Sequence, residues 1–137
     1  FNGHMANGVA SFPCGMVERH PDFVVIAAAN TYGNGADRQY VGRNQLDAAS
    51  LDRFAFVDMG YDQAMEIELS GNESWAAHVQ RIRAAINELK IRHIVSPRAS
   101  IKGARMLAAG MDPDTVEQAY IWKGLGQSDI EKIKAAW

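Results

Sequence analysis

The sequence of 137 residues contains a single cysteine, Cys14, which excludes an intrachain disulfide. One thiol cannot anchor a zinc site, and the four histidines show no metal-ligand spacing, so no metal centre is expected. No apolar run approaches the roughly 20 residues that span a bilayer, and no signal peptide is visible. We therefore expect no membrane partner and a reducing, cytoplasmic location.

The chain also lacks a strong charge of either sign. Its formal net charge of −2 gives no bulk electrostatic reason to expect nucleic acid as a partner. It contains no G-x-x-x-x-G-K-[ST] motif, and no hydrophobic strand ends in paired acids that would hold Mg²⁺. With 47% hydrophobic and 22% charged residues, it has the composition of a globular protein that buries its own core.

The first five residues, Phe-Asn-Gly-His-Met, resemble the remnant of a cloning tag. We therefore leave residues 1–5 out of the fold prediction. From Ala6 the chain enters strand-like sequence with no opening element before it. We expect it to be a fragment of a larger protein.

Residues 6–60 have the pattern of an α/β structure. Turn residues within 9–19 predict a β-hairpin, and the apolar run at 23–29 predicts a buried strand. Alternation at 54–59 predicts a second strand. Between the two strands, the sequence predicts a loop rich in Gly and Asn and then a short helix within "NQLDAASLDRF".

Residues 61–137 have only helical patterns, and they predict an all-α bundle of about four helices. The strongest pattern is an apolar stripe with spacings of 4, 3, 4 and 3, formed by Trp75, Val79, Ile82, Ile86 and Leu89. The change from mixed to helical patterns places a boundary near residue 60.

Several residue pairs predict where these helices begin. Ser96-Pro97 and Asp112-Pro113 each combine an N-cap residue with proline at the first helical position. Capping boxes are predicted for the pairs Ser70–Glu73 and Ser128–Glu131. Gly71 and Gly110 are expected to end helices.

Asn30 is the first candidate for chemistry, because it directly follows the predicted strand at 23–29. In open α/β sheets, ligands bind beyond the carboxyl ends of the strands. The Asn30 amide can therefore be aimed at a phosphate or at an attacking water. The alternative is that Asn30 and Thr31 only satisfy a turn.

Two arginines are further candidates. Arg53 lies between a predicted helix end and a strand, where it can cap the helix, pair with Asp52, or offer its guanidinium to a phosphate. Arg98 lies in the first turn of a predicted helix, where a cation opposes the helix dipole. An anion bound at that helix start removes the conflict, whereas a solvent-facing arginine bears it as a small penalty.

The order of these features resembles a known family. A hairpin, a strand that ends in "AAANT", a Gly-rich loop, "LDAASLDRF", a second strand and a helical bundle with "SPRA" resemble the C-terminal half of an AAA+ ATPase. The closest resemblance is to the MoxR-like and cobaltochelatase-type (CobS-like) branch, and it extends from residue 6 to about residue 110. It implies that 6–60 is the end of the α/β core and 61–137 the helical lid.

The resemblance also implies roles for the candidate residues. Asn30 matches the sensor-1 position, which orients the hydrolytic water near the γ-phosphate. Arg53 matches the arginine finger, which acts in the neighbouring subunit's site. Arg98 matches the sensor-2 arginine of the lid, and the hairpin would point toward the ring's pore or a partner.

The whole protein implied by this resemblance would hydrolyse ATP with Mg²⁺ in a ring, expected to be a hexamer, to remodel a client protein or load metal into it. This chain lacks the phosphate loop and the Mg²⁺-holding acids, so it should bind no nucleotide tightly by itself. The strand that bears the phosphate loop in the family lies between the two strands predicted here. These strands must then stay unpaired, pair with each other, or borrow a partner from a second molecule.

Two other classes of function remain open. Residues 96–125 can form a helix-turn-helix in which Arg98, Lys102 and Arg105 face DNA phosphates. The net charge and the acids Asp114 and Glu117 in the second helix count against this reading. The chain can also be an adaptor that uses this half-fold for binding only.

Overall fold

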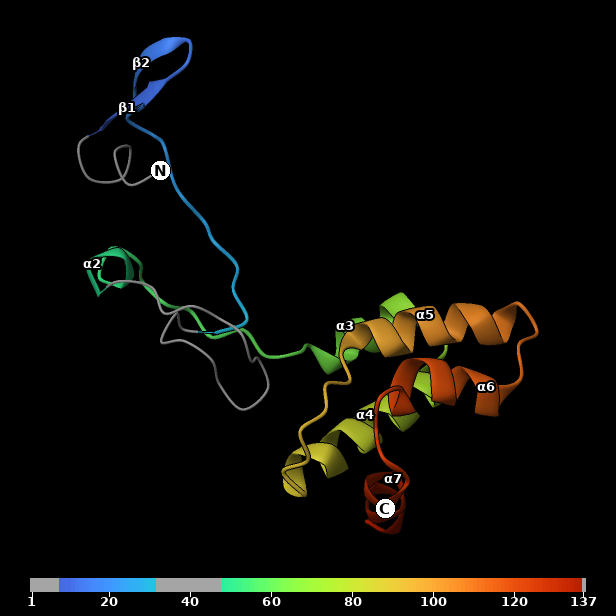
Figure 1. The fold of residues 1–137 in the computed structure, drawn as a ribbon. Coiled ribbons are helices and arrows are strands. Elements are labelled where there is room, and N and C mark those ends of the chain that lie inside the picture. Colours follow the sequence, from blue (N-terminus) through green and yellow to red (C-terminus); the bar gives the residue numbers. More distant parts are fainter. Residues whose placement is uncertain (1–7, 32–47, 137) are drawn as a thin grey trace. The chain divides into compact units, whose positions relative to one another are not determined.

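The computed structural model describes residues 8–31 and 48–136, and the chain divides after Asp58 into two units (Figure 1). The described part of the first unit holds a β-hairpin and one short helix. The second unit, Met59–Trp137, is helical, and it contains all of the buried residues among those described. The combination of a hairpin with a helical bundle agrees with the prediction in outline.

The hairpin pairs β1 (Val9–Phe12) with β2 (Gly15–Glu18) in antiparallel register. Pro13 and Cys14 form the two-residue turn, and Phe12 lies opposite Gly15. Gly15 has a φ of 125°, which a residue with a Cβ rarely adopts. The predicted hairpin is therefore confirmed, with glycine at the position that requires it.

The two predicted strands at 23–29 and 54–59 are not formed, and these predictions were wrong. Neither segment has strand hydrogen bonds among the described residues. Their apolar side chains are also open to solvent, with Ile26 92% and Val57 81% exposed. A strand needs a neighbour to bond its backbone and cover its side chains, and the described residues offer none. The two segments do not pair with each other as strands in the described part of the chain.

The short helix predicted before Arg53 is present as α2 (Ala48–Leu51). At the end of this helix, the amide of Asp52 donates a hydrogen bond to the Ala48 carbonyl at 2.9 Å. The amide of Phe54 donates in turn to the Leu51 carbonyl at 3.1 Å. Leu46, which the sequence places on the same side as Ala49, lies outside the described residues.

The second unit contains more helices than predicted. In chain order these are α3 (Gln63–Ser70), α4 (Glu73–Glu88), α5 (Pro97–Ala108), α6 (Pro113–Glu117), the π-helical turn η1 (Gln118–Trp122) and α7 (Gln127–Ala135). Because η1 continues α6, the described residues of this unit form five helices rather than about four.

Most of the predicted helix ends are confirmed. Gly71 ends α3 in the left-handed region with a φ of 65°, and its amide donates to the carbonyls of Ile67 and Glu68. Asp112 caps α6 through a carboxylate oxygen that accepts from the Thr115 amide at 3.0 Å. Each of these contacts is local, so the sequence alone could indicate it.

Both predicted capping boxes were wrong. The N-cap of α4 is Asn72, whose Oδ1 accepts from the Trp75 amide at 3.0 Å. The Ser70 hydroxyl is engaged elsewhere, since it donates to the Ile67 carbonyl at 2.8 Å. The last helix, α7, begins after Gly126 instead of Ser128.

Replacing Asn72 with Ala is expected to lower the free energy of unfolding of the helical unit by about 1 kcal/mol, because it removes the side-chain cap of α4. Urea unfolding followed by circular dichroism measures the change. Glu73→Ala is the control, because Glu73 contributes only its charge near the helix dipole and should cost a few tenths of a kcal/mol. An equal loss in both variants would contradict the assignment of Asn72 as the cap.

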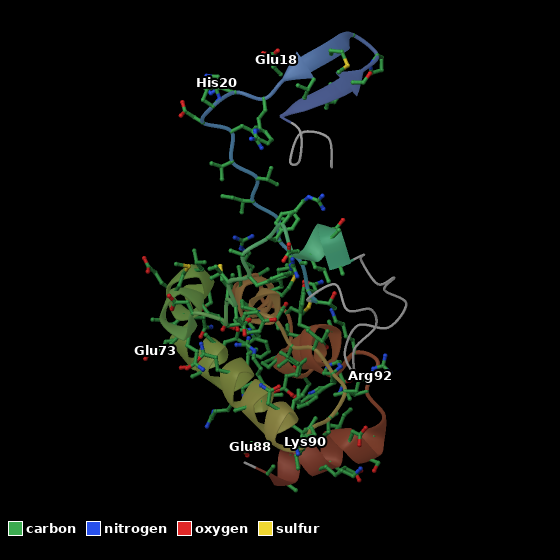
Figure 2. The ribbon with its side chains drawn as sticks, turned by 90° about the vertical axis from the view of Figure 1, so that its left-hand side faces the viewer. Glu18, His20, Glu73, Glu88, Lys90 and Arg92 are labelled. Carbon is green, nitrogen blue, oxygen red and sulfur yellow. The ribbon has the colours of Figure 1, made fainter. Side chains whose placement is uncertain are left out.

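The core of the unit forms between α4, α5, α6, η1 and α7. Four residues of the predicted stripe on α4 are buried, namely Trp75, Val79, Ile82 and Ile86. Leu89 is 41% exposed, because α4 ends at Glu88 and Leu89 is its C-cap. Glu73 and Glu88 mark the two ends of this helix in Figure 2. In the described ranges, no helix has the length and apolar character needed to cross a bilayer.

Candidate functional site

Arg98 is the sequence-predicted residue with the clearest structural setting. It is the second residue of α5, after Pro97 at the first helical position and Ser96 at the N-cap. The Ser96 side chain makes no capping hydrogen bond, so it leaves the first amides of α5 without a side-chain acceptor. The Arg98 side chain is exposed, and among the described residues no hydrogen bond or ion pair engages it. Pro97 has no N–H, and the Ala99 amide donates to the Ser96 carbonyl at 2.9 Å. The Arg98 guanidinium, beside its own amide, is therefore the group of this helix start that can meet an anion.

Arg53 follows α2 and contacts that helix. Its guanidinium donates to the carbonyl of Ala49. This contact matches the capping role that the sequence left open beside the phosphate role. The residue is exposed, and the bond to Ala49 occupies one nitrogen of a guanidinium with five N–H donors, so an anion can reach the others.

Asn30 is exposed at the end of the extended segment. With Ala28, Ala29 and Thr31 it lines a hollow of about 220 Å³. In the described part of the first unit, no hydrogen bond joins Asn30 to Arg53. Arg98 belongs to the second unit.

A buried ionic cluster centred on Glu66 was not predicted. Glu66 is the one fully buried residue of α3, and only 2% of its surface is exposed. Its two carboxylate oxygens accept from the guanidinium nitrogens of Arg83 on α4 at 2.8 and 2.7 Å. The Ser100 hydroxyl on α5 also donates to Glu66, and Arg83 Nε donates to the Val95 carbonyl at 2.6 Å. Three helices are therefore joined at one carboxylate.

The charge of Glu66 is stabilised in this setting. Burial raises the pKa of the Glu66 carboxyl, but hydrogen bonds from Arg83 and Ser100 and the positive charge of Arg83 outweigh burial. The pKa therefore lies below its ordinary value, and the ion pair is formed at neutral pH. The Tyr61 ring packs on Arg83, with its centroid 4.8 Å from the guanidinium carbon. The cluster holds three helices together, and its carboxylate is too buried to meet a substrate.

One sequence signal could have indicated this cluster. Arg83 is not part of the apolar stripe, but it lies four residues after Val79 and three before Ile86, at the edge of the buried face. A cation at such an edge requires a buried partner. Nothing local identifies Glu66 as that partner, because it lies 17 residues away on another helix.

A second polar cluster links α4 to the end of α6. His78 Nε2 lies 2.7 Å from Glu117 Oε1, and the Trp122 indole donates to Glu117 Oε2 at 2.8 Å. His93 Nε2 lies 2.6 Å from the Ile121 carbonyl within η1. These contacts hold the π-helical turn, and they bring no nucleophile beside the histidines.

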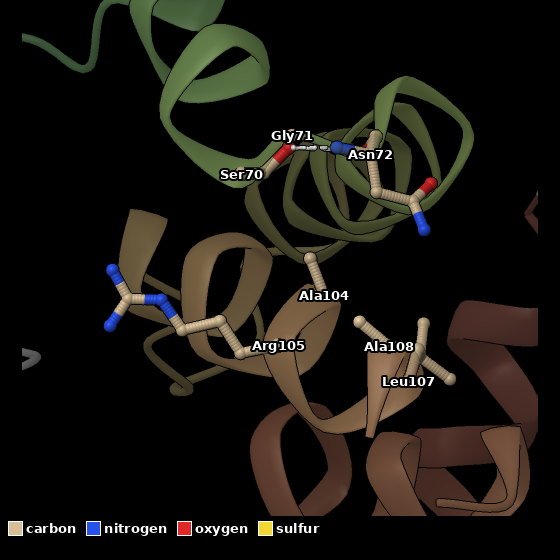
Figure 3. Close-up of a pocket in the computed structure, with 7 residues that line it drawn as sticks. All are labelled: Ser70, Gly71, Asn72, Ala104, Arg105, Leu107 and Ala108. Atoms are coloured by element: carbon tan, nitrogen blue, oxygen red, sulfur yellow. Dashed lines mark hydrogen bonds between the residues drawn. The ribbon is translucent and has the colours of Figure 1, made fainter. Parts of the chain in front are cut away.

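The helical unit also has a groove between the α3–α4 turn and the second half of α5 (Figure 3). Its volume is about 290 Å³. Ser70, Gly71 and Asn72 line one side, and Ala104, Arg105, Leu107 and Ala108 line the other. In Figure 3 the Arg105 guanidinium extends away from Ala108, so the aliphatic part of the side chain borders the groove.

Residues 8–31 and 48–136 contain no group of three or more His, Cys, Asp or Glu side chains that could hold a metal ion. Comparisons with known protein families, with characterised proteins and with solved structures found no match to this chain. The function is therefore argued from the chain's own residues.

Proposed function

We propose that this chain is the C-terminal part of an AAA+ ATPase that works in an oligomeric ring. Asn30 would be sensor 1, Arg53 the arginine finger and Arg98 sensor 2. The observation that carries the proposal is the start of α5, where Arg98 is exposed in the first turn and the helix has no side-chain cap. Such a helix start fits one phosphate group of a nucleotide.

The arrangement along the chain supports this proposal. A hairpin comes first, a polar residue follows an extended apolar segment, and a separate helical unit begins near residue 59. The apolar segments at 23–29 and 54–59 are suited to a sheet that the described residues do not complete. The missing strand would bear the phosphate loop, and ATP with Mg²⁺ would bind there with Arg98 on one side.

Arg53 fits the arginine finger in a specific way. Its bond to the Ala49 carbonyl holds the side chain beside α2 in the absence of a neighbour. A phosphate of a neighbouring subunit would offer two charged oxygens in place of one carbonyl, and a guanidinium prefers that bidentate partner. The client that the ring would remodel or load with metal is not identified by any residue described.

The proposal predicts a two-part result. Isothermal titration of MgATP or MgADP into this chain should give no binding heat. The same nucleotides should leave the Tm of the chain unchanged in a thermal melt. The chain extended by the coding sequence upstream of it should hydrolyse ATP. In that longer protein, Arg53→Ala should lower kcat by at least about a hundredfold, whereas Arg92→Ala, an exposed arginine elsewhere, should leave kcat unchanged.

Mixed rings test whether Arg53 acts between subunits. Asn30→Ala and Arg53→Ala proteins should each be inactive, yet an equal mixture should regain about a quarter of the wild-type rate, because one site in four then combines both native residues. No recovery would contradict action between subunits. Tight MgATP binding by this chain alone, or a longer protein without ATPase activity, would overturn the proposal.

A further inference from the structure

The outward face of α5 concentrates positive charge. Arg98, Lys102 and Arg105 follow one another at spacings of four and three residues, which places them on one side of the helix. All three are exposed, and none has an ionic partner among the described residues. No acid occurs in α5, so this helix is strongly positive in a chain of net charge −2.

Three other cations of the same unit are engaged. Arg83 pairs with Glu66, Lys132 lies 3.0 Å from Asp129, and Lys134 lies over the Trp122 ring. Like charges one turn apart on a helix repel each other by a few tenths of a kcal/mol. An anionic partner would remove this repulsion along the whole face.

The groove adjoins this face at Arg105. Ala104, Leu107 and Ala108 give one wall an apolar lining of mostly small side chains (Figure 3). Its volume of about 290 Å³ is larger than a leucine side chain needs. A ligand that fits both features therefore has negative groups beside an aliphatic group.

We propose that the α5 face docks an acidic amphipathic peptide segment of a partner protein. Carboxylates of the segment pair with Lys102 and Arg105, and an aliphatic side chain enters the groove beside Ala108. A nucleic acid fits less well, because its phosphates would meet the cations and leave the apolar wall exposed. This docking does not depend on the proposed nucleotide contact of Arg98.

Fluorescence anisotropy with a labelled synthetic peptide, EEALEEALEEALEE, tests the docking. Lys102→Glu/Arg105→Glu should weaken binding by about tenfold or more, and added salt should weaken it in the wild type. Arg92→Glu/Lys123→Glu is the matched control, since it makes the same charge change at exposed residues outside α5 and should change affinity less than about twofold. Ala108→Tyr fills the groove without a charge change and should also weaken binding by about tenfold.

Two altered peptides separate charge from the groove. Replacing each Leu with Ser, or each Glu with Gln, should abolish binding to the wild type. Equal loss in both double variants would overturn the proposal in favour of unspecific attraction. If the Ser peptide binds as tightly as the Leu peptide, the groove has no part in docking and the proposal is wrong on that point. Binding of a random DNA duplex that is lost in Lys102→Glu/Arg105→Glu, without binding of the peptide, would assign the face to nucleic acid. Circular dichroism checks that each variant is folded.

Discussion

Replacing Arg83 with Met is expected to lower the free energy of unfolding of the helical unit by about 3–5 kcal/mol. The substitution keeps most of the aliphatic volume and removes the charge that neutralises Glu66. Glu66 is then left ionised with only 2% of its surface exposed. The Ser100 hydroxyl and the long contact from Gln80 Nε2 at 3.5 Å cannot compensate for the lost water. Arg83 also donates to the Val95 carbonyl, which loses its partner. Urea unfolding monitored by circular dichroism measures the change.

Removing the charge of Glu66 should restore part of this stability. The double variant Glu66→Gln/Arg83→Met places no ion in the core, so it should be more stable than Arg83→Met alone by about 1–3 kcal/mol. The wild type, Glu66→Gln, Arg83→Met and the double variant form a double-mutant cycle. The cycle separates the interaction energy of the pair from the effect of the changed side-chain volume. A loss below about 1 kcal/mol in Arg83→Met would show that the pair contributes little.

The pH dependence provides an independent check on the same pair. The pKa of Glu66 lies below its unfolded value, so its contribution is fully present above the unfolded pKa and is lost as pH falls through the folded one. The wild type should therefore lose stability below about pH 4. In Arg83→Met the hydrogen bonds and the charge of Arg83 are gone, and burial, the largest influence on the carboxyl, raises its pKa against the hydrogen bonds of Ser100 and Gln80. This variant should therefore gain stability on mild acidification.

The helical unit was largely predictable because its signals are local. The stripe that begins at Trp75, the left-handed end at Gly71 and the start at Asp112-Pro113 each depend on residues within about two turns. The Glu66 cluster was not predictable, because it joins three helices whose packing no local pattern specifies. On α3, a carboxylate is buried, while Met65 and Leu69 are 55% and 59% exposed, the reverse of what hydropathy indicates.

The predictions for the first unit failed for a different reason. The segments at 23–29 and 54–59 have strong strand propensity, but a strand forms only against a partner. Neither segment has such a partner among the described residues, so propensity alone did not produce a strand. Among the candidate residues, Arg98 lies at the helix start that the sequence predicted. The Arg53–Ala49 bond was only one of several alternatives.

Replacing Gly103 with Ala is expected to destabilise the helical unit by about 2 kcal/mol, although alanine favours a helix over glycine by about 1 kcal/mol. A Cβ at this position would lie 2.5 Å from the indole nitrogen of Trp75 and 2.6 Å from its Cζ2. The ring cannot move away freely, because Trp75 is 7% exposed and its indole donates to the Ala99 carbonyl at 3.1 Å. The new methyl must therefore break this bond or separate α4 from α5.

The partner ring supplies the decisive control for Gly103→Ala. Phenylalanine lacks the indole nitrogen and the fused ring that face Gly103, so in a Trp75→Phe background the same change should be neutral or stabilising by up to about 1 kcal/mol. Gly60→Ala, which meets no atom within 4 Å, should cost nothing in either background. Thermal unfolding of the wild type, Gly103→Ala, Trp75→Phe and the double variant measures the coupling energy between positions 75 and 103. An equal effect of Gly103→Ala with Trp and with Phe at position 75 would show that the Trp75 ring does not restrict the size of the residue at position 103.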